Sequence, residues 1–410
     1  MRILYINHYA GSPRHGMEYR PYYLSREWVR FGHEVCIVAA DYSHLRVQRP
    51  QLDGRDRLDE SIDGVRYTWL RTLPYARNGF ARVRNIGSFM FRLYQHGQRL
   101  AAERKPDVVI ASSTYPMDVW PAHRIASLAG ARLVFEIHDL WPLTPMEVGG
   151  MSRWHPFILT AQAAENYVYR NASAVVSMLP KVHAHVAARG LAVDRLHIVP
   201  NGIDPGEWPA RTAPLAEALE GRLARIAEAG NAIVGYAGNH GISNSLDTLL
   251  KTAENMRGEK VSFVLVGGGP EKEKLERWAQ SEQLRNVHFA DPVAKEQIPA
   301  LLQWFDIAFI GWKRQPLYRF GIAPNKLMDY MMAARPVLHA VEAGNDSVGE
   351  SGCGLTVAPE CPGALAHGIR SLIGLSDAER QAMGARGKEF VLRHFTYPVL
   401  SARFLAACGE

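Results

Sequence analysis

Short runs of β-branched and aromatic residues alternate with helical patterns along the whole chain, and this alternation constrains the fold more than any other feature. Such runs, separated by helices, are typical of parallel sheets built from βαβ units. The expected strands of the first half are residues 2–6, 34–40, 65–70, 107–113, 132–137 and 174–179. The pattern then restarts, with expected strands at 232–238, 261–269, 286–290, 307–311, 336–340 and 354–358. The sequence therefore predicts an α/β protein with two Rossmann-like, doubly wound domains.

Residues 200–214, PNGIDPGEWPARTAP, are dense in proline and glycine and predict the connection between the domains. We expect an N-terminal domain over residues 1–205 and a C-terminal domain over residues 206–410. The last helix, at about 390–410, is expected to cross back to the N-terminal domain. Ligands of open α/β sheets lie beyond the carboxyl ends of the strands, so the two domains are expected to face each other across one cleft.

The composition excludes several classes of protein. With 47% hydrophobic and 21% charged residues, it is typical of a soluble globular chain. No window approaches the roughly 18 to 20 apolar residues of a membrane-spanning helix, and the first residues, MRILYINHYA, lack the apolar core of a secretory signal. The four cysteines have no metal-like spacing, which favours reduced thiols, a cytoplasmic location and no zinc site.

Positive charge is concentrated in the first half, with a net charge of +8 for residues 1–200 and −2 for the remainder. Residues 71–105 contain eight basic residues and one acid. A solvated helix face explains this excess, and so does attraction to an anionic membrane surface or a phosphorylated acceptor. Residues 84–101 also place an apolar stripe on one helical face, which suits packing on the sheet or peripheral contact with a membrane. We expect no nucleic-acid partner.

In the first half, candidate binding residues follow two expected strands. The loop that ends at Gly16 can bring backbone N–H groups close to a ligand, with Arg20 on the next helix, although a plain turn and an exposed arginine explain the pattern equally well. His138 and Asp139 follow the strand at 132–137. His138 can donate a hydrogen bond to a phosphate or a sugar hydroxyl, and Asp139 can orient the imidazole or cap a helix.

In the second half, two segments run from a strand through a glycine loop into a helix. They are VGYAGNHGISNSLDTLL and VLVGGGPEKEKLERWAQ, and the second contains Gly268 in a run of three glycines. Such loops present backbone N–H groups and a helix dipole to an anion. A tight turn is the alternative for the glycines.

Residues 319–340, RFGIAPNKLMDYMMAARPVLHA, predict a glycine loop, a helix from about Asn325 to Ala334, and a buried strand. Lys326 lies in the first turn of this helix, where unpaired N–H groups disfavour a cation. A bound pyrophosphate would be stabilised by those N–H groups and by the ammonium. An ion pair with Asp329 is the alternative, but this orientation contributes only about 0.2 to 0.5 kcal/mol. In the ligand interpretation, Asp329 accepts both hydroxyls of a ribose.

Taken in order, these segments resemble the retaining glycosyltransferases of the GT4 type, which have the GT-B fold and move a sugar from a nucleotide donor to an acceptor. The segments are the Gly16 loop with REWVRFGHEV, then EIHD, IVPNGID, YAGN, VLVGGGPEKEKLE, NVHFADPV and PNKLMDYMMAARPVL. The variant PNKLMDYM is most similar to members that build bacterial surface polysaccharides such as O-antigen or capsule. These members include transferases of N-acetylated deoxyhexosamines.

The resemblance implies that the C-terminal domain holds a nucleotide-diphosphate sugar, expected to be UDP-linked, and that the N-terminal domain holds a glycan or polyprenyl-diphosphate-linked acceptor. Transfer would occur with retention of configuration, without metal or another cofactor, at the inner face of the cell membrane. We assign catalytic roles to His138 and Lys326. The expected donor contacts are Gly16, Asn239, His240, Gly268, Pro292, Val293, Gly321, Ile322, Ala323 and Asp329, and the expected acceptor contacts are Arg20 and Asp139.

The sequence departs from the family pattern at two places. The family usually has an acid where this chain has Gly321, so the backbone around Gly321, Ile322 and Ala323 is expected to contact the sugar. Many relatives also place an arginine and a lysine on the diphosphate after the segment matching YAGN, whereas this chain has His240, Ile242 and Ser243. A donor with altered or missing hydroxyls would suit the first departure.

Two other functions stay open. A nucleotide-sugar 2-epimerase uses the same paired architecture, but the chain lacks a convincing set of carboxylates for elimination and proton transfer. The other is a non-catalytic GT-B binding protein, which Gly321 and the missing diphosphate cations favour.

Overall fold

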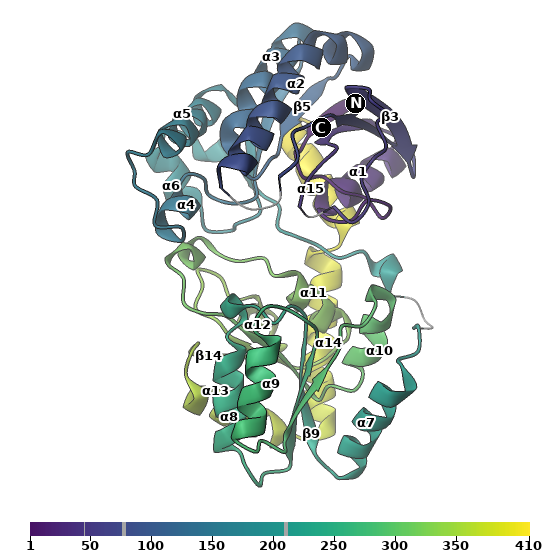
Figure 1. Ribbon diagram of the computed structural model, residues 1–410, viewed down its shortest axis with the longest axis vertical. Coiled ribbons are helices and arrows are strands. Elements are labelled where there is room, and N and C mark those ends of the chain that lie inside the picture. The colour runs from purple at the N-terminus through teal and green to yellow at the C-terminus, as the bar shows by residue number, and fades with distance from the viewer. Residues whose placement is uncertain (45, 76–78, 209–211) are drawn as a thin grey trace. The chain divides into compact units, whose positions relative to one another are not determined.

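The computed structural model describes residues 1–44, 46–75, 79–208 and 212–410, so residues 209–211 of the expected connection lie outside the described residues. The chain forms two compact units, residues 1–201 with 397–410 and residues 202–396. Figure 1 shows the course of the chain through both units. The expected boundary at residue 205 therefore lies just inside the second unit, and the crossing helix begins at Tyr397 rather than near residue 390.

The first unit contains an eight-stranded sheet within the described residues, in the order β3-β4-β2-β1-β5-β6-β7-β8. Its strands are β1 (Arg2–Ile6), β2 (Glu34–Ala40), β3 (Arg57–Ile62), β4 (Val65–Leu70), β5 (Val108–Ala111), β6 (Arg132–Ile137), β7 (Ala174–Ser177) and β8 (Leu196–Ile198). Its α-helices are α1 (Arg20–Arg30), α2 (Phe80–Arg104), α3 (Val119–Ala129), α4 (Leu143–Glu147), α5 (Pro156–Asn171), α6 (His183–Ala188) and α15 (Tyr397–Cys408).

The prediction of a purely parallel sheet is wrong at one edge of the first unit. β3 pairs with β4 in antiparallel register, and its sequence, RLDESI, contains three charged residues. An edge strand that exposes one face has no continuous apolar run, so the pattern used to find buried strands does not detect it. The short strand β8 was missed for the same reason, since its residues are only half-buried.

Aromatic packing joins α1 to α15 on one face of the first sheet. Trp28 of α1 is fully buried, with its ring centroid 5.5 Å from that of Tyr5 on β1 and 5.1 Å from that of Phe404 on α15. The indole N–H of Trp28 donates a hydrogen bond to the carbonyl of Ser401 at 3.1 Å. In Figure 1, α15 lies beside α1, although the two helices come from opposite ends of the chain. The last helix therefore completes the core of the first unit.

The second unit contains a six-stranded parallel sheet within the described residues, in the order β11-β10-β9-β12-β13-β14. Its strands are β9 (Ala232–Ala237), β10 (Val261–Val266), β11 (Val287–Ala290), β12 (Ile307–Gly311), β13 (Val337–Ala340) and β14 (Gly354–Val357). Its α-helices are α7 (Glu217–Glu228), α8 (Leu246–Asn255), α9 (Lys272–Ser281), α10 (Ile298–Leu302), α11 (Asn325–Met332), α12 (Ser347–Ser351), α13 (Pro362–Ile373) and α14 (Asp377–His394). Short 3-10 helices of the two units lie at Pro116–Asp118, Val193–Arg195, Pro205–Glu207, Ile242–Asn244, Lys295–Gln297 and Pro316–Phe320.

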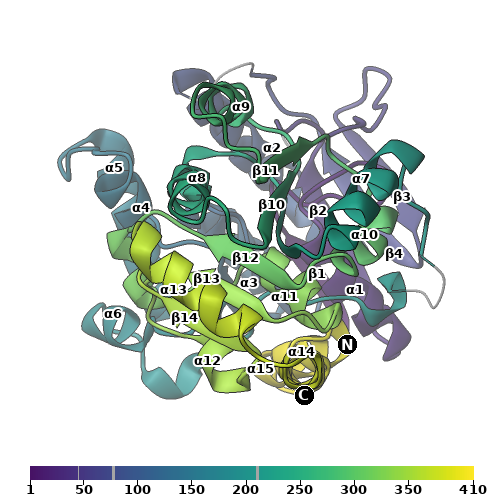
Figure 2. The same ribbon diagram turned by 90° about the horizontal axis from the view of Figure 1, so that it is seen from below.

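Helices cover both faces of the second sheet, as Figure 2 shows. Helices α8, α9 and α13 share one apolar core, which contains Leu249, Leu275 and Leu365. Helices α7, α10, α11 and α14 share the other core, which contains Leu327 and Val391. The second unit is therefore doubly wound, and all six strands predicted for the second half are present. Among the described residues, no helix is both long and apolar enough to cross a bilayer.

We expect Phe404→Ala to destabilise the first unit by about 3 to 5 kcal/mol, because it removes a buried aromatic ring from the contact between α1 and α15. Amide hydrogen exchange of β1 and β6 measures the change. Arg403→Ala, on the exposed side of the same helix, is the matched control and should leave this protection unchanged. Unchanged protection in Phe404→Ala would show that α15 does not stabilise the first unit.

Candidate functional site

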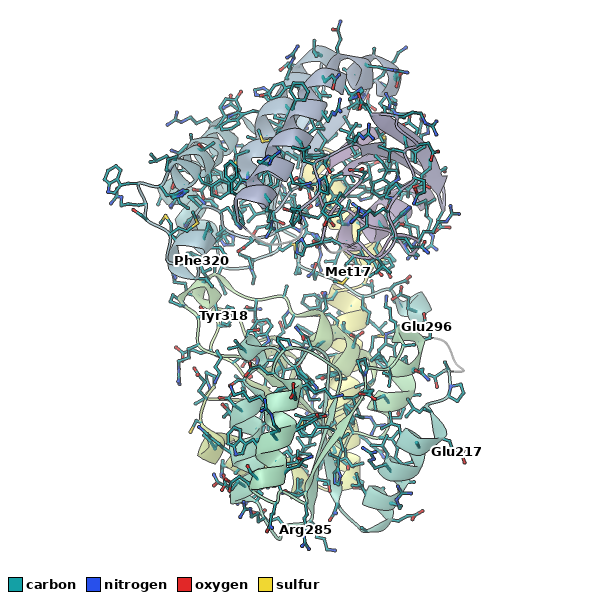
Figure 3. All side chains as sticks on the ribbon, viewed as in Figure 1. Met17, Glu217, Arg285, Glu296, Tyr318 and Phe320 are labelled. Carbon is teal, nitrogen blue, oxygen red and sulfur yellow. The ribbon has the colours of Figure 1, made fainter. Side chains whose placement is uncertain are left out.

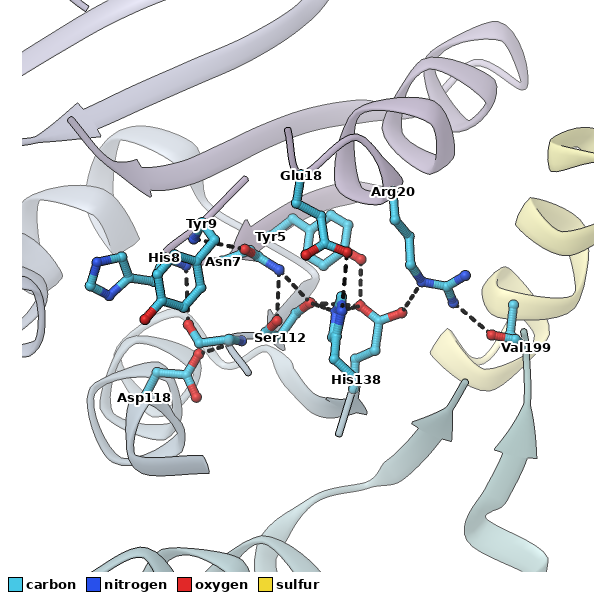
Figure 4. A network of polar contacts seen from close by, with 12 residues as sticks. Tyr5, Asn7, His8, Tyr9, Glu18, Arg20, Ser112, Asp118, His138 and Val199 are labelled. Carbon is cyan, nitrogen blue, oxygen red and sulfur yellow. Dashed lines mark hydrogen bonds and ion pairs between the residues drawn. The ribbon is translucent and has the colours of Figure 1, made fainter. Parts of the chain in front are cut away.

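A buried carboxylate organises the carboxyl ends of the first sheet (Figure 4). Glu136 lies on β6 and is fully buried. Its carboxylate accepts hydrogen bonds from the hydroxyl of Tyr5 at 2.5 Å, from the hydroxyl of Ser112 at 2.6 Å and from Nε of Arg20 at 2.8 Å. Burial would raise the pKa of Glu136, but Arg20 and His138 outweigh it and hold this pKa well below its usual range. Glu136 is therefore ionised inside the protein.

The imidazole of His138 lies between two carboxylates. Its Nε2 is 2.8 Å from Oγ of Ser112 and 3.1 Å from Oε2 of Glu136, while its Nδ1 is 3.6 Å from Oε1 of Glu18. Burial would lower the pKa of His138, but Glu136 and Glu18 raise it to about 10. The ring is thus a charged imidazolium at neutral pH, with both nitrogens protonated.

The structure contradicts the acceptor role expected for Arg20. The side chain is 2% exposed, and its guanidinium donates to Glu136 and to the carbonyls of Val199 and Pro200 at 2.7 and 2.5 Å. These contacts hold the chain where it leaves the sheet after β8. A buried guanidinium with these partners is structural, so Arg20 is not an acceptor contact.

The structure also contradicts a role for Asp139 in orienting His138. The carboxylate of Asp139 accepts from the backbone N–H of Leu140 at 2.9 Å, from Nε1 of Trp141 at 3.2 Å and from the hydroxyl of Thr144 at 2.6 Å. These bonds tie the loop after β6 to α4. Glu136, two residues earlier on the same strand, is the residue that holds the imidazole.

Gly16 lies in a closed turn. Its N–H donates to the carbonyl of Ser12 at 2.9 Å, and its carbonyl accepts from the N–H of Ser12 at 3.1 Å. Its φ of +90° is a conformation that glycine adopts without strain, and an added Cβ would lie 2.9 Å from the side chain of Val47. The N–H of Gly16 is used within the turn, and the predicted contact of Gly16 with the donor stays a prediction.

The second unit has a pocket of about 480 Å³ at the carboxyl ends of β9, β10 and β11. Its lining residues are Ala237, Gly238, Asn239, Val266, Gly267, Gly268, Gly269, Pro292, Val293 and Ile298. Four residues that the sequence predicts as donor contacts, Asn239, Gly268, Pro292 and Val293, thus come together in one place. The volume is typical of a small-molecule site.

His240 lies beneath this pocket. Its backbone N–H donates to the carbonyl of Gly268 at 2.7 Å, which joins the two glycine loops. Its ring is fully buried, and neither ring nitrogen has a hydrogen-bond partner among the described residues. Burial, followed by the charges of Lys272 and Lys326, lowers the pKa of His240 to about 4, so the ring is neutral at physiological pH. A buried neutral ring adds no positive charge for a diphosphate.

Lys326 extends from α11 to the loop that follows β9. Its Nζ donates to the hydroxyl of Tyr236 at 2.8 Å and to Oδ1 of Asn244 at 3.0 Å, and it lies 4.7 Å from the centre of the Tyr236 ring. An added Cβ at Gly238, where φ is +147°, would fall 2.3 Å from Cε of Lys326. Burial lowers the pKa of Lys326 to about 8. Among the described residues no carboxylate pairs with this ammonium, so the alternative ion pair with Asp329 is absent.

Asp329 follows Lys326 by one turn and is partly buried. Within the described part of the chain, no group donates a hydrogen bond to its carboxylate. Burial raises the pKa of Asp329 to about 7, with a smaller opposing effect of Lys295. This carboxylate therefore has its acceptor capacity available for a ligand diol.

The backbone N–H groups of Gly321 and Ile322 are used within the protein. The N–H of Gly321 donates to the carbonyl of Tyr318 at 2.9 Å, and the N–H of Ile322 donates to Oδ1 of Asn345 at 2.7 Å. Nδ2 of Asn345 also donates to the carbonyl of Ile322 at 3.1 Å. Figure 3 marks Tyr318 on this segment, which leads through Ala323 into α11. The N–H groups of Gly321 and Ile322 are thus engaged within the second unit, and the predicted contact of this backbone segment with the sugar stays a prediction.

The residues that hold the predicted ones in place were not expected from the sequence. In the first unit these are Glu18, Ser112 and Glu136; in the second they are Tyr236, Asn244 and Asn345. Glu136 had a detectable signal, since an acid inside the apolar run RLVFEI needs a buried partner. Across the described ranges, no cluster of three or more His, Cys, Asp or Glu side chains is arranged to hold a metal ion.

Two families match this chain. The first unit matches the glycosyl transferase 4-like domain family over residues 15–202, and the second matches the glycosyl transferases group 1 family over residues 231–374. Together the matched residues make up more than half of the chain. The chain therefore belongs to the glycosyltransferases.

One curated relative and two solved structures are similar to this chain. The chain is 26% identical over 387 residues to a protein named as a colanic acid biosynthesis glycosyl transferase, WcaI, from Escherichia coli (strain K12), with 90% of this chain and 92% of that protein covered. Its fold is similar to sucrose-phosphate synthase from Thermosynechococcus elongatus, with a TM-score of 0.72, 16% identity, and 99% and 98% of the two chains covered. It is also similar to HepE from Anabaena in complex with UDP, with a TM-score of 0.68, 14% identity, and 99% of each chain covered. The fold is GT-B.

We expect Glu136→Gln to lower the pKa of His138, because the substitution removes the closest negative charge from the imidazolium. It should also destabilise the first unit by about 3 to 5 kcal/mol, since Arg20 remains buried without its carboxylate. Imidazole NMR signals measured against pH report the first effect. The His138 contribution to stability is present below its ordinary pKa of about 6.5 and is lost as the pH rises towards about 10.

Glu165→Gln is the matched control. Glu165 is also a buried acid of the first unit, and it accepts from His185 and Arg189, each at 2.9 Å. This variant should lose stability without a change in the titration of His138. If His138 titrates unchanged in Glu136→Gln, Glu136 is not the cause of the raised pKa of His138.

Proposed function

We propose that this glycosyltransferase moves a sugar from a UDP-linked donor to an acceptor, with retention of configuration, in the synthesis of a bacterial surface polysaccharide. The observation that carries the proposal is the ammonium of Lys326, desolvated and without a carboxylate partner in the described chain, beside the pocket at the ends of β9, β10 and β11. Such an ammonium suits an anionic ligand. The relationship to a colanic acid biosynthesis enzyme supports the polysaccharide, and the structure of HepE with UDP supports the nucleotide.

The pocket suggests how the donor binds. The glycine loop, with Gly268 at its centre, would accept the diphosphate, while Pro292 and Val293 would pack against the base. Asp329 would accept the ribose hydroxyls. In the first unit, we assign His138 to binding a phosphate or a sugar hydroxyl of a substrate through Nδ1, whose nearest carboxylate oxygen, Oε1 of Glu18, is 3.6 Å away.

The chemistry follows from where charge develops. As the glycosidic bond to the diphosphate breaks, negative charge accumulates on the leaving UDP, and a fixed ammonium stabilises this charge more than it stabilises the ground state. Lys326 would supply this stabilisation without a metal ion. The acceptor hydroxyl would attack the face from which the diphosphate leaves and pass its proton to the leaving diphosphate oxygen, which preserves the anomeric configuration.

Product analysis tests this function and separates it from its rivals. The protein is incubated with a panel of UDP-sugars, with and without a bacterial glycolipid extract as acceptor. We expect UDP release that depends on the acceptor, with the donor's anomeric configuration in the product by NMR. A changed sugar that remains attached to UDP would indicate an epimerase. If the protein neither turns over a UDP-sugar nor binds UDP, a non-catalytic protein is favoured.

We expect Lys326→Gln to lower kcat/KM by about 10²- to 10³-fold, because it removes the charge beside the leaving group. UDP affinity of the unaltered protein should weaken as the pH rises through about 8, since deprotonation removes that charge, and the variant should lack this dependence. Calorimetric titration of UDP at several pH values measures it.

Lys313→Gln is the matched control for Lys326→Gln. Lys313 belongs to the same unit, and its Nζ pairs with Asp247 at 2.7 Å and Glu360 at 3.5 Å. Loss of this surface ion pair should change activity little. Equal decreases in kcat/KM in the two variants would show that Lys326 does not stabilise the leaving group.

A further inference from the structure

The second unit contains a further pocket, which we name the α9–β11 pocket, with a volume of about 430 Å³. It lies between α9 and β11, which are neighbours in Figure 2. The described residues that line it are all different from those that line the pocket at the carboxyl ends of β9, β10 and β11. In Figure 3, Arg285, which lines the α9–β11 pocket, lies at the opposite end of the second unit from Tyr318. The α9–β11 pocket is therefore separate from the proposed donor site.

The floor of the α9–β11 pocket is apolar. Ala279 of α9 and Leu284 are buried there. Val287 and Phe289 are half-buried, and they point to the same face of β11 because alternate residues of a strand share a face. Among the described strands, β11 is at the edge of the second sheet. A ligand that packs on this floor therefore removes hydrocarbon and one aromatic ring from water.

The rim of the α9–β11 pocket is polar. It consists of Glu276, Gln280, Gln283 and Arg285. Within the described part of the chain, the side chains of the last three make no hydrogen bond or ion pair. The carboxylate of Glu276 lies 3.9 Å from Nζ of Lys272, which is longer than a hydrogen bond. Two amides, a carboxylate and a guanidinium are thus available to donate and accept hydrogen bonds around an apolar floor.

A neutral saccharide has the chemistry that this lining recognises. One face of a pyranose ring presents C–H groups that pack on an apolar floor, and its edge presents hydroxyls that donate and accept hydrogen bonds. The rim contains one acid, Glu276, and one base, Arg285, so its charge favours neither a phosphorylated ligand nor a basic segment of another protein. The volume is within the range of small-molecule sites, which suits a short stretch of saccharide.

We propose that the α9–β11 pocket binds a neutral saccharide, with a sugar ring against Phe289 and sugar hydroxyls on Gln280 and Arg285. This inference goes beyond the proposed function, because it adds a saccharide site that takes no part in donor binding. It rests on that function only for the source of the saccharide, a segment of the polysaccharide to which the enzyme contributes. A second contact of this kind raises the effective concentration of the polymer at the enzyme.

Saturation-transfer difference NMR of the full chain tests the proposal at saturating UDP, which fills the donor site. The probes are the neutral trisaccharides maltotriose, cellotriose and chitotriose, with trigalacturonic acid as the anionic reference. We expect at least one neutral trisaccharide to bind, with an affinity that UDP does not change. The proposal is wrong if none of these trisaccharides binds, if UDP displaces the one that does, or if trigalacturonic acid binds as tightly.

Two variants locate the site. Gln280→Ala and Arg285→Ala should each weaken binding of that trisaccharide roughly fivefold, since each removes a hydrogen-bonding side chain from the rim. Both side chains are exposed, so the variants should fold and keep their affinity for UDP. Arg277→Ala is the matched control, because Arg277 is exposed on the same helix and does not line the pocket. Equal effects of Arg277→Ala and Arg285→Ala would overturn the proposal.

Two further measurements distinguish the other interpretations. If sedimentation shows self-association that Arg285→Ala weakens, and no trisaccharide binds, the pocket is an interface between copies of the chain and the proposal is wrong. Acceptor-dependent UDP release is measured with the same samples. Failure of the trisaccharides to bind while UDP release persists refutes only this inference, whereas trisaccharide binding without UDP release refutes the proposed function.

Discussion

The buried charge of Glu136 is the constraint on which the first unit depends. An ionised carboxylate inside a sheet is tolerated only where hydrogen bonds and opposite charge replace water. Tyr5 brings β1 to this carboxylate, Ser112 brings the end of β5, and Arg20 brings α1. Arg20 also binds the carbonyls that follow β8, so one charge fixes the place where the chain leaves the sheet. His138 is held as an imidazolium by the same carboxylate, which joins the stability of the fold to the candidate site.

Periodicity in the sequence predicted the buried strands of both units because such strands need continuous apolar runs. It failed at β3, where a half-exposed edge strand contains three charged residues. It also had no means to place Arg20, whose partner Glu136 lies 116 residues away. A lone arginine after a glycine loop looks the same whether it faces solvent or a buried acid. Long-range pairing of charges is therefore the part of the first unit that local pattern does not contain.

Lys326 illustrates what a local pattern does contain. Its position in the first turn of α11 is unfavourable for a cation because of the helix dipole, and this predicts an anionic ligand. In the structure its ammonium lies beside the pocket. The residues that receive it, Tyr236 and Asn244, lie 90 and 82 residues away and carried no signal of their own. Gly321 shows what such a pattern does not contain, because nothing in the local sequence indicates that its N–H closes a turn with Tyr318. The geometry of a turn decides which backbone N–H groups of a loop have partners, and amino-acid composition does not determine that geometry.

The two units treat buried charge in opposite ways. In the first, Glu136 and His138 stabilise each other's charged forms, so both stay ionised without a ligand. In the second, burial lowers the pKa of Lys326 to about 8, without a partner of opposite charge in the described chain. It raises the pKa of Asp329 to about 7, where Lys295 opposes the shift only in part. A ligand that carries negative charge would supply the missing partner for Lys326 and raise its pKa again. Binding of such a ligand would remove the free-energy cost of burying this ammonium without a counter-charge. The charge state of Lys326 therefore depends on whether the donor is bound.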